Sequence, residues 1–218
     1  MGKNEWIEEG WKSIKKVKEW DRPGWIDPEE TGWDSISEAI KWYDEGWYNQ
    51  KEALRWYKDG WDDPETAMDW KNIGWTNPKK AGKWFDAGFD EHREAWKWYN
   101  VGWDNPKEAL KWKEAGWDDP AEAMDWYEAG WADPYRARKW YKAGWENFMV
   151  AKKWFDAGWD DPVEAKKWWD VGWTDPEEAL EWLDAEWTSP KDALEIYKKY
   201  KYWNLLSNSY KKTDLTKS

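Results

Sequence analysis

Hydrophobic and polar positions repeat every 14 residues from Trp33 to Trp187, without an insertion. The unit reads W-D-D-P-E-E-A-L-K-W-Y-D-A-G, and unit positions are numbered here from its first tryptophan. The first position is Trp in every unit except one, which has Phe89, and the seventh is Ala in every unit. The tenth is Trp as far as Trp182 and becomes Ile196 in the last unit. Such a fixed short period predicts a tandem array of one small structural element.

Each unit predicts one helix of about ten residues. Asp119 precedes Pro120, which is the order of an N-cap residue followed by proline at the first helical position. Units without the proline compensate; Ser35 and Glu38, for example, have the spacing of a capping box. The glycine that ends a unit predicts a left-handed C-cap, where a residue without Cβ is favoured.

The tryptophan after each glycine predicts a hydrophobic latch across the helix end. In a Schellman motif the residue after the capping glycine contacts the residue five positions earlier. That spacing pairs Trp131 with Trp126 and Trp173 with Trp168. The small seventh residue, on the same helix face as the tenth, should let a neighbouring helix approach closely. The predicted latch comprises Trp117, Trp126, Gly130, Trp131, Trp168, Gly172 and Trp173.

These elements predict an all-α fold, an α-solenoid or superhelix of about twelve single-helix repeats with terminal capping helices. Four regions are expected: an N-terminal capping segment with divergent repeats (1–32), the tandem repeats (33–187), a C-terminal capping helix (188–206) and a polar tail (207–218).

The motif P-x-x-A-x-x-W-x-x-A-G-W, from Pro120 to Trp131, resembles short tandem helical arrays of uncharacterised bacterial proteins. It is similar in principle to tetratricopeptide-type solenoids, although their longer helix-pair signature is absent. The resemblance implies a helical repeat scaffold. It transfers no catalytic or binding residue.

Composition changes the expected partners. The 218 residues include 34 Lys and Arg against 46 Asp and Glu, a net charge of -12, which should repel nucleic acid and anionic membranes. Aromatic residues make up 20%, unlike the aromatic-poor composition of disordered chains. No secretion signal or membrane-spanning stretch is evident, so a cytoplasmic location is expected.

Candidate chemistry is sparse. Without cysteine, disulfides, thiolate metal sites and thiol nucleophiles are excluded. His92, the single histidine, takes the proline position of an atypical unit, where a surface or capping role is favoured over general-base work. Paired acids such as Asp118 and Asp119 are explained by capping and lack the ligand spacing of a calcium loop. We expect no enzyme activity, cofactor or metal site.

Eight residues are candidates for binding a partner. Basic pairs occupy positions eight and nine of three successive units, where stacked helices should align them into a ridge for an acidic partner, although a solvated face explains them equally well. Two further tryptophans lie outside the repeating positions, at the edge of the core or on a binding stripe. The candidates are Arg138, Lys139, Lys152, Lys153, Lys166, Lys167, Trp96 and Trp169.

The function expected first is a non-enzymatic scaffold for protein–protein interaction. The alternatives are a structural protein that self-assembles into a filament or lattice, and a carbohydrate-binding module that uses exposed tryptophan. Capping segments at both ends argue against unlimited end-to-end stacking, and sugar binding requires that indoles be left exposed.

Overall fold

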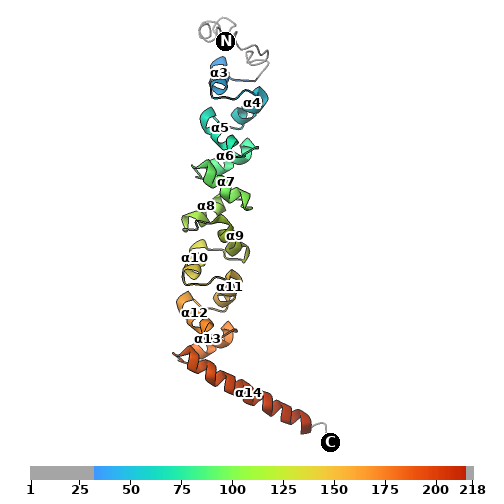
Figure 1. Ribbon diagram of the computed structural model, residues 1–218, viewed down its shortest axis with the longest axis vertical. Helices are drawn as coiled ribbons and strands as arrows, with labels where there is room; N and C mark the ends of the chain where they lie inside the picture. The colour runs from blue at the N-terminus through green and yellow to red at the C-terminus, as the bar shows by residue number, and fades with distance from the viewer. Residues whose placement is uncertain (1–31, 215–218) are drawn as a thin grey trace. The chain divides into compact units, whose positions relative to one another are not determined.

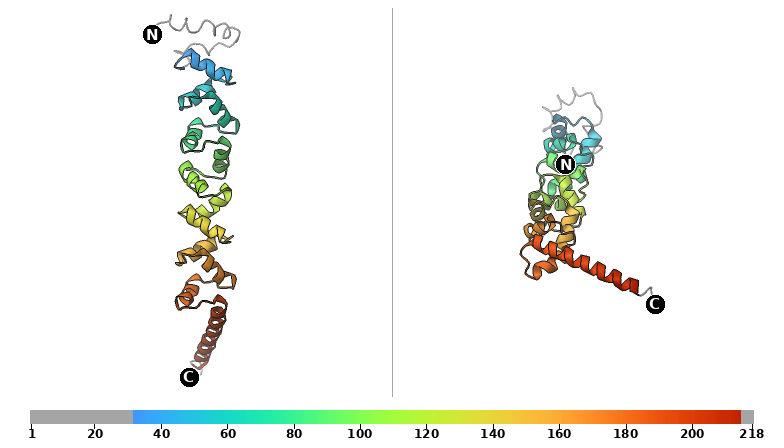
Figure 2. Two further views of the ribbon diagram at one scale, coloured as in Figure 1. Left: turned by 90° about the vertical axis from the view of Figure 1, so that its left-hand side faces the viewer. Right: turned by 60° about the horizontal axis from the view of Figure 1, so that its bottom comes forward.

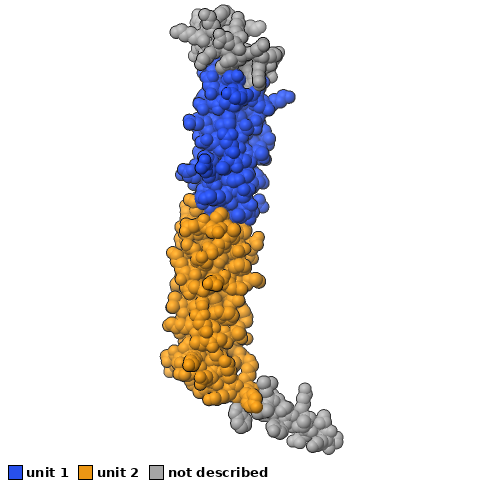
Figure 3. All heavy atoms as spheres, viewed as in Figure 1, with its two compact units in different colours: residues 1–110 blue, residues 111–218 orange. Residues whose placement is uncertain are grey.

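The computed structural model describes residues 32–214, which are helical and contain no strand. The chain divides into two compact units, residues 1–110 and 111–218 (Figure 3). In order along the chain (Figure 1), the helices are α3 (Ile36–Asp44), α4 (Gln50–Lys58), α5 (Pro64–Asn72), α6 (Pro78–Asp86), α7 (His92–Asn100), α8 (Pro106–Glu114), α9 (Pro120–Glu128), α10 (Pro134–Lys142), α11 (Phe148–Asp156), α12 (Pro162–Asp170), α13 (Pro176–Asp184) and α14 (Pro190–Asp214). The prediction of one helix per unit is confirmed.

The predicted helix starts are confirmed. Asp119 accepts hydrogen bonds from the backbone N–H groups of Ala121 and Glu122, which α9 leaves without a helical partner. The Ser35 hydroxyl likewise accepts from the N–H of Glu38 at 3.0 Å. His92 begins α7, and Glu91 before it makes no side-chain cap bond. The capping chemistry therefore sets the start of nearly every helix in the described part of the chain.

The predicted helix ends are confirmed as Schellman motifs. Gly130 has a φ of 88° and donates to the carbonyl of Tyr127 at 3.0 Å, while Trp131 donates to the carbonyl of Trp126 at 3.3 Å. The Trp131 and Trp126 rings lie 5.2 Å apart, so the latch forms as expected. Trp173 and Trp168 repeat the contact at 5.3 Å. Backbone hydrogen bonds and indole contact act on the same turn.

The aromatic side chains at the first and tenth positions of the repeats form a continuous row of rings inside each of the two compact units. Ring centroids of successive members lie 4.9 to 6.4 Å apart from Trp33 to Trp103. From Trp112 to Trp187 the spacing is 5.1 to 5.9 Å. Burying one indole removes about 150–250 Å² from water, worth at most roughly 4–6 kcal/mol, and helices this short are marginal in water without such packing.

A second tryptophan contact joins many of the repeats to the next one. The indole N–H of Trp117 donates to the backbone carbonyl of Pro134, the first residue of α10, at 3.1 Å. The same bond recurs 14 residues later, where Trp131 donates to Phe148 at 3.3 Å. Because the acceptor is a backbone carbonyl, Phe148 can accept this bond as proline does; the indole N–H of Trp75, which lies 17 residues before His92, is buried without a hydrogen-bond partner.

Within each compact unit, successive helices alternate between two columns of stacked helices. In the first unit α4 contacts α6 and α5 contacts α7. In the second unit α9, α11 and α13 follow one another, and α10, α12 and the start of α14 form the other column (Figures 1 and 2). The seventh-position alanines are fully buried between the columns, for example Ala123 and Ala137. Together with the tryptophan row they form the core.

The C-terminal helix differs from the expectation in one respect. Helix α14 continues to Asp214, so the boundary near residue 206 is wrong and the tail expected from residue 207 is helical as far as residue 214. The reason is that residues 191–214 contain no glycine or proline to stop the helix. The expected N-terminal capping segment (1–32) lies outside the described residues apart from Gly32.

Candidate functional site

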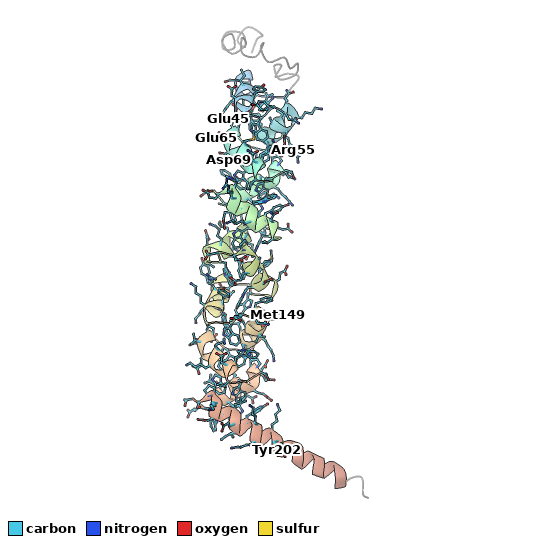
Figure 4. All side chains as sticks on the ribbon, in the orientation of Figure 1. Glu45, Arg55, Glu65, Asp69, Met149 and Tyr202 are labelled. Atoms are coloured by element: carbon cyan, nitrogen blue, oxygen red, sulfur yellow. The ribbon has the colours of Figure 1, made fainter. Side chains whose placement is uncertain are left out.

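Three positions of the 14-residue repeat, five, nine and twelve, lie on the exposed face of each helix. With 3.6 residues per turn these positions share one face of the helix, opposite the buried alanine and tryptophan. They are exposed in every helix from α3 to α13. We call them the outward positions. Figure 4 shows the arrangement in the first unit, where Arg55 on α4 and Glu65 and Asp69 on α5 lie on opposite sides.

The outward positions differ from unit to unit although the core repeats. Helix α4 has Lys51, Arg55 and Lys58 there. At the same positions α13 has the acids Glu177, Glu181 and Asp184. The repeating core therefore presents a surface whose charge changes from helix to helix.

The basic pairs expected to form one ridge are divided between the two columns. Arg138 and Lys139 are on α10 and Lys166 and Lys167 on α12, whereas Lys152 and Lys153 are on α11 in the other column. The ninth-position residues Lys139, Lys153 and Lys167 are exposed at outward positions, and the eighth-position residues are half-buried. Binding of an acidic partner by these residues stays a prediction.

The eighth position has a packing role that the sequence analysis did not assign to it. A methyl group placed on Gly130 would come within 3.8 Å of Lys152 Cε, and one on Gly144 equally close to Lys166 Cε. The side chain of this position thus covers the capping glycine two units earlier. Lys152 pairs with Asp156 and Lys166 with Asp170 on the same helix, so both charges are partly satisfied.

Arg138 lies over two aromatic rings. Its guanidinium lies 5.1 Å from the Trp117 ring centroid and 5.0 Å from that of Tyr141, with Asp118 at 4.0 Å. Contact with two aromatic faces stabilises a cation in addition to its ion pair. Arg138 therefore belongs to the edge of the core.

The candidate tryptophans Trp96 and Trp169 also lie at the edge of the core. The Trp96 ring is 5.2 Å from that of Trp75, and its Cζ2 would lie 2.7 Å from a methyl group on Gly74. Trp169 lies 6.1 Å from Trp145. Both are half-buried, and their role in partner binding stays a prediction.

The eleventh-position aromatics stack on the first tryptophan of the preceding unit. Tyr57 lies 4.9 Å from Trp33, and its hydroxyl donates to Asp34 at 2.6 Å. This hydrogen bond, with a smaller effect of burial, raises the pKa of Tyr57 to about 12 because ionisation would break the bond and place a phenolate beside a carboxylate. The hydroxyl therefore stays protonated and donates at every physiological pH.

A surface hollow of about 460 Å³ lies in the described part of the first compact unit. It lies between the end of α6 and the start of α8 and is lined by charged residues that include Lys83, Asp86, Asp104 and Lys107. No group of His, Cys, Asp and Glu able to hold a metal ion is found in the described part of the chain. Nor do the described helices include one with the length and apolar character to cross a membrane.

No protein-family model matches the chain, and no curated protein or solved structure matches it significantly. Among the described residues, the outward positions and the eighth position are two of the features that differ from one repeat to the next.

Proposed function

We propose that the chain is a non-enzymatic repeat scaffold that binds other protein surfaces through its outward positions. One observation carries the proposal: the core residues are nearly the same in every unit, whereas the exposed residues at positions five, nine and twelve differ from helix to helix. A repeated core with a varied surface is the arrangement that lets stacked repeats present one extended binding surface.

The burial of the repeating tryptophans favours a protein partner over a sugar. From Trp33 to Trp173 the first- and tenth-position indoles are at most 6% exposed, so their faces are covered by other side chains, whereas Trp182 and Trp187 are half-buried. Sugar binding by stacking needs an open aromatic face. A protein partner needs only the side chains that the outward positions already expose.

The charge of the chain favours selected protein surfaces over polyanions. The net charge of -12 repels nucleic acid at long range. Basic residues are nevertheless grouped locally, as on α4, where an acidic protein segment can approach without meeting a dense phosphate backbone. For these reasons we propose that partners bind to individual helix faces.

Selection of a random-peptide display library on the immobilised full chain tests the proposal. We expect an enriched peptide family whose binding is lost when the charges at the outward positions of one helix are reversed, and retained when the charges at the same positions of another helix are reversed. The matched series K51E/R55E/K58E on α4 and E177K/E181K/D184K on α13 changes the same three positions. Failure to enrich any peptide family would overturn the proposal.

A further inference from the structure

In the second compact unit, three successive 14-residue repeats have a large apolar side chain at outward position five. Tyr135 on α10 is 61% exposed, Met149 on α11 is 68% exposed, and Val163 on α12 is 54% exposed. The other described units have a charged or small residue there, namely Ser37, Lys51, Glu65, Lys79, Arg93, Lys107, Ala121, Glu177 and Lys191. Single exposed apolar residues are common, but three at the same position of consecutive repeats form a pattern that internal packing does not explain.

Charge is segregated between the two columns that carry these residues. We call the outward positions of α9, α11 and α13 the acidic face: beside Met149 and Lys153 it carries Asp125, Glu128, Asp156, Glu177, Glu181 and Asp184. We call the outward positions of α10 and α12 the basic face: beside Tyr135, Val163 and Asp170 it carries Lys139, Lys142 and Lys167. Both faces combine charge of predominantly one sign with at least one exposed apolar side chain.

The two faces point away from each other. Each column buries its alanines and tryptophans in the core between the columns, and the outward positions lie on the opposite side of each helix. Met149 is seen on the α11 side of the unit in Figure 4. One compact unit therefore has an acidic face on one side and a basic face on the other.

The faces also share one spacing. Both columns are built from the same 14-residue unit, and in each the neighbouring helices are two repeats apart. A second copy of the chain thus presents carboxylates at the same helix-to-helix spacing as the lysines that they would meet. No ion pair within the described residues involves Lys139, Lys142, Glu181 or Asp184, so these charges are available.

We propose that a second copy of this chain binds side by side, with its acidic face on the basic face of the first and Met149 between Tyr135 and Val163. The proposal rests on the proposed function and names its partner. Because the two faces differ, the contact is heterologous, and each added copy leaves one acidic and one basic face free. Such a contact generates an open row of chains.

Charge and apolar groups contribute to this contact in different ways. The net charge of -12 opposes association at long range. At about 0.15 M salt, however, charges farther apart than about 8 Å are largely screened, which leaves the adjoining faces to interact. A foreign acidic segment could pair with the lysines equally well. Unlike a second copy of the chain, however, it would not have to match the helix-to-helix spacing or place an apolar side chain between Tyr135 and Val163.

Light scattering on a sizing column, over a wide range of protein concentration, tests the proposal. We expect the wild-type mass to rise above 26.5 kDa as concentration increases. The basic-face variant K139E/K142E/K167E and the acidic-face variant E177K/E181K/D184K should each associate roughly 5- to 100-fold more weakly, since three exposed ion pairs are lost. The control K51E/R55E/K58E on α4 makes the same charge change as the basic-face variant and should leave association unchanged.

Mixing the two variants gives the decisive result. The basic-face variant keeps its acidic face and the acidic-face variant keeps its basic face, so the mixture should associate more strongly than either variant does alone. A wild-type mass that stays at 26.5 kDa, a mixture that stays monomeric, or a control that weakens association as strongly would each overturn the proposal.

The two proposals can fail separately. If the wild-type mass stays constant while peptides are enriched by the full chain, the second copy is not the partner and the scaffold proposal stands. If the mass rises and the mixture associates while no foreign peptide is enriched, self-association stands and binding of other proteins does not.

Discussion

The same substitution, glycine to alanine, should have opposite effects at two sites 22 residues apart. Gly60 ends its unit with a φ of 97°, in the region that side chains with a Cβ avoid. Nothing lies within 4 Å of the Cβ that alanine would add, so the effect at this site is purely conformational. Gly82 lies inside α6, and its added Cβ would meet Trp61 Nε1 at 3.8 Å, an ordinary contact.

The magnitudes follow from backbone energetics. At Gly60 the left-handed conformation costs a residue with Cβ roughly 1–2 kcal/mol, partly offset by about 0.4–1 kcal/mol from the lower entropy of the unfolded chain. G60A should therefore lower the free energy of unfolding by about 1 kcal/mol. Alanine inside a helix is favoured over glycine by roughly 0.5–1 kcal/mol, so G82A should raise it by that amount.

Thermal unfolding followed by circular dichroism measures the difference. For a chain of this size, 1 kcal/mol shifts the midpoint by about 2–4 °C. Because repeat arrays can unfold in segments, hydrogen exchange at the Trp61 amide, which donates to the Trp56 carbonyl, should also be followed and should become faster in G60A. G74A provides a third point: its Cβ would lie 2.7 Å from Trp96, so its loss should exceed that of G60A. Equal stability of G60A and G82A would refute the reasoning.

Three further predictions follow from single contacts. E186G should raise the free energy of unfolding, measured by urea titration, by about 0.5–1 kcal/mol, because Glu186 has a φ of 66° at the capping position where the preceding repeats have glycine. A loss of stability would contradict this. W61F should lower the free energy of unfolding by about 1–3 kcal/mol in the same assay, because the 3.1 Å hydrogen bond from the indole N–H to the Pro78 carbonyl is lost and less apolar surface is buried. An unchanged free energy of unfolding would show that the bond contributes nothing. D34N should lower the pKa of Tyr57 from about 12 towards 10, which a phenolate absorbance titration of each protein against its Y57F counterpart measures. Because the folded-state pKa is raised, the contribution of this hydrogen bond to stability is present below pH 10 and is lost as pH rises through about 12; an unchanged titration in D34N would contradict the assignment.

The local features were predictable because each depends on a few neighbouring residues. Asp before Pro fixes the helix start, and Gly before Trp fixes the helix end together with the contact five residues back. The burial of the seventh and tenth positions followed from the same period. Sequence reasoning therefore predicted the helices, their caps and their core.

The division into two columns was not predictable from the period. Odd and even units have the same pattern, so nothing in the repeat indicates that consecutive helices lie on alternate sides. For that reason the pairs from Arg138 to Lys167 were expected in one ridge although they belong to two columns. The role of position eight was missed because its contact is with a glycine two units earlier, as between Lys152 and Gly130, and the residue types there range from leucine to lysine.

The outward positions could have been found from the sequence alone. A helical wheel places positions five, nine and twelve opposite the core, and the exposed residues Tyr135, Met149 and Val163 then stand out. What the wheel does not give is which of these residues share a side of the molecule. The acidic and basic faces become visible only when the columns are known.

The alternation of columns has a consequence for changes in repeat number. Removal of one 14-residue unit, for example residues 145–158 with α11, would transfer α12 to the column that α11 now occupies. Every later helix would change sides with it, so acids and lysines would be exchanged between the two surfaces although no remaining residue was altered. Removal of two units would shorten the array and leave each helix on its original side. Whether the number of units gained or lost is even or odd therefore decides whether a surface survives, and a family of such arrays that keeps its surfaces should vary in length in steps of 28 residues, twice the 14-residue period.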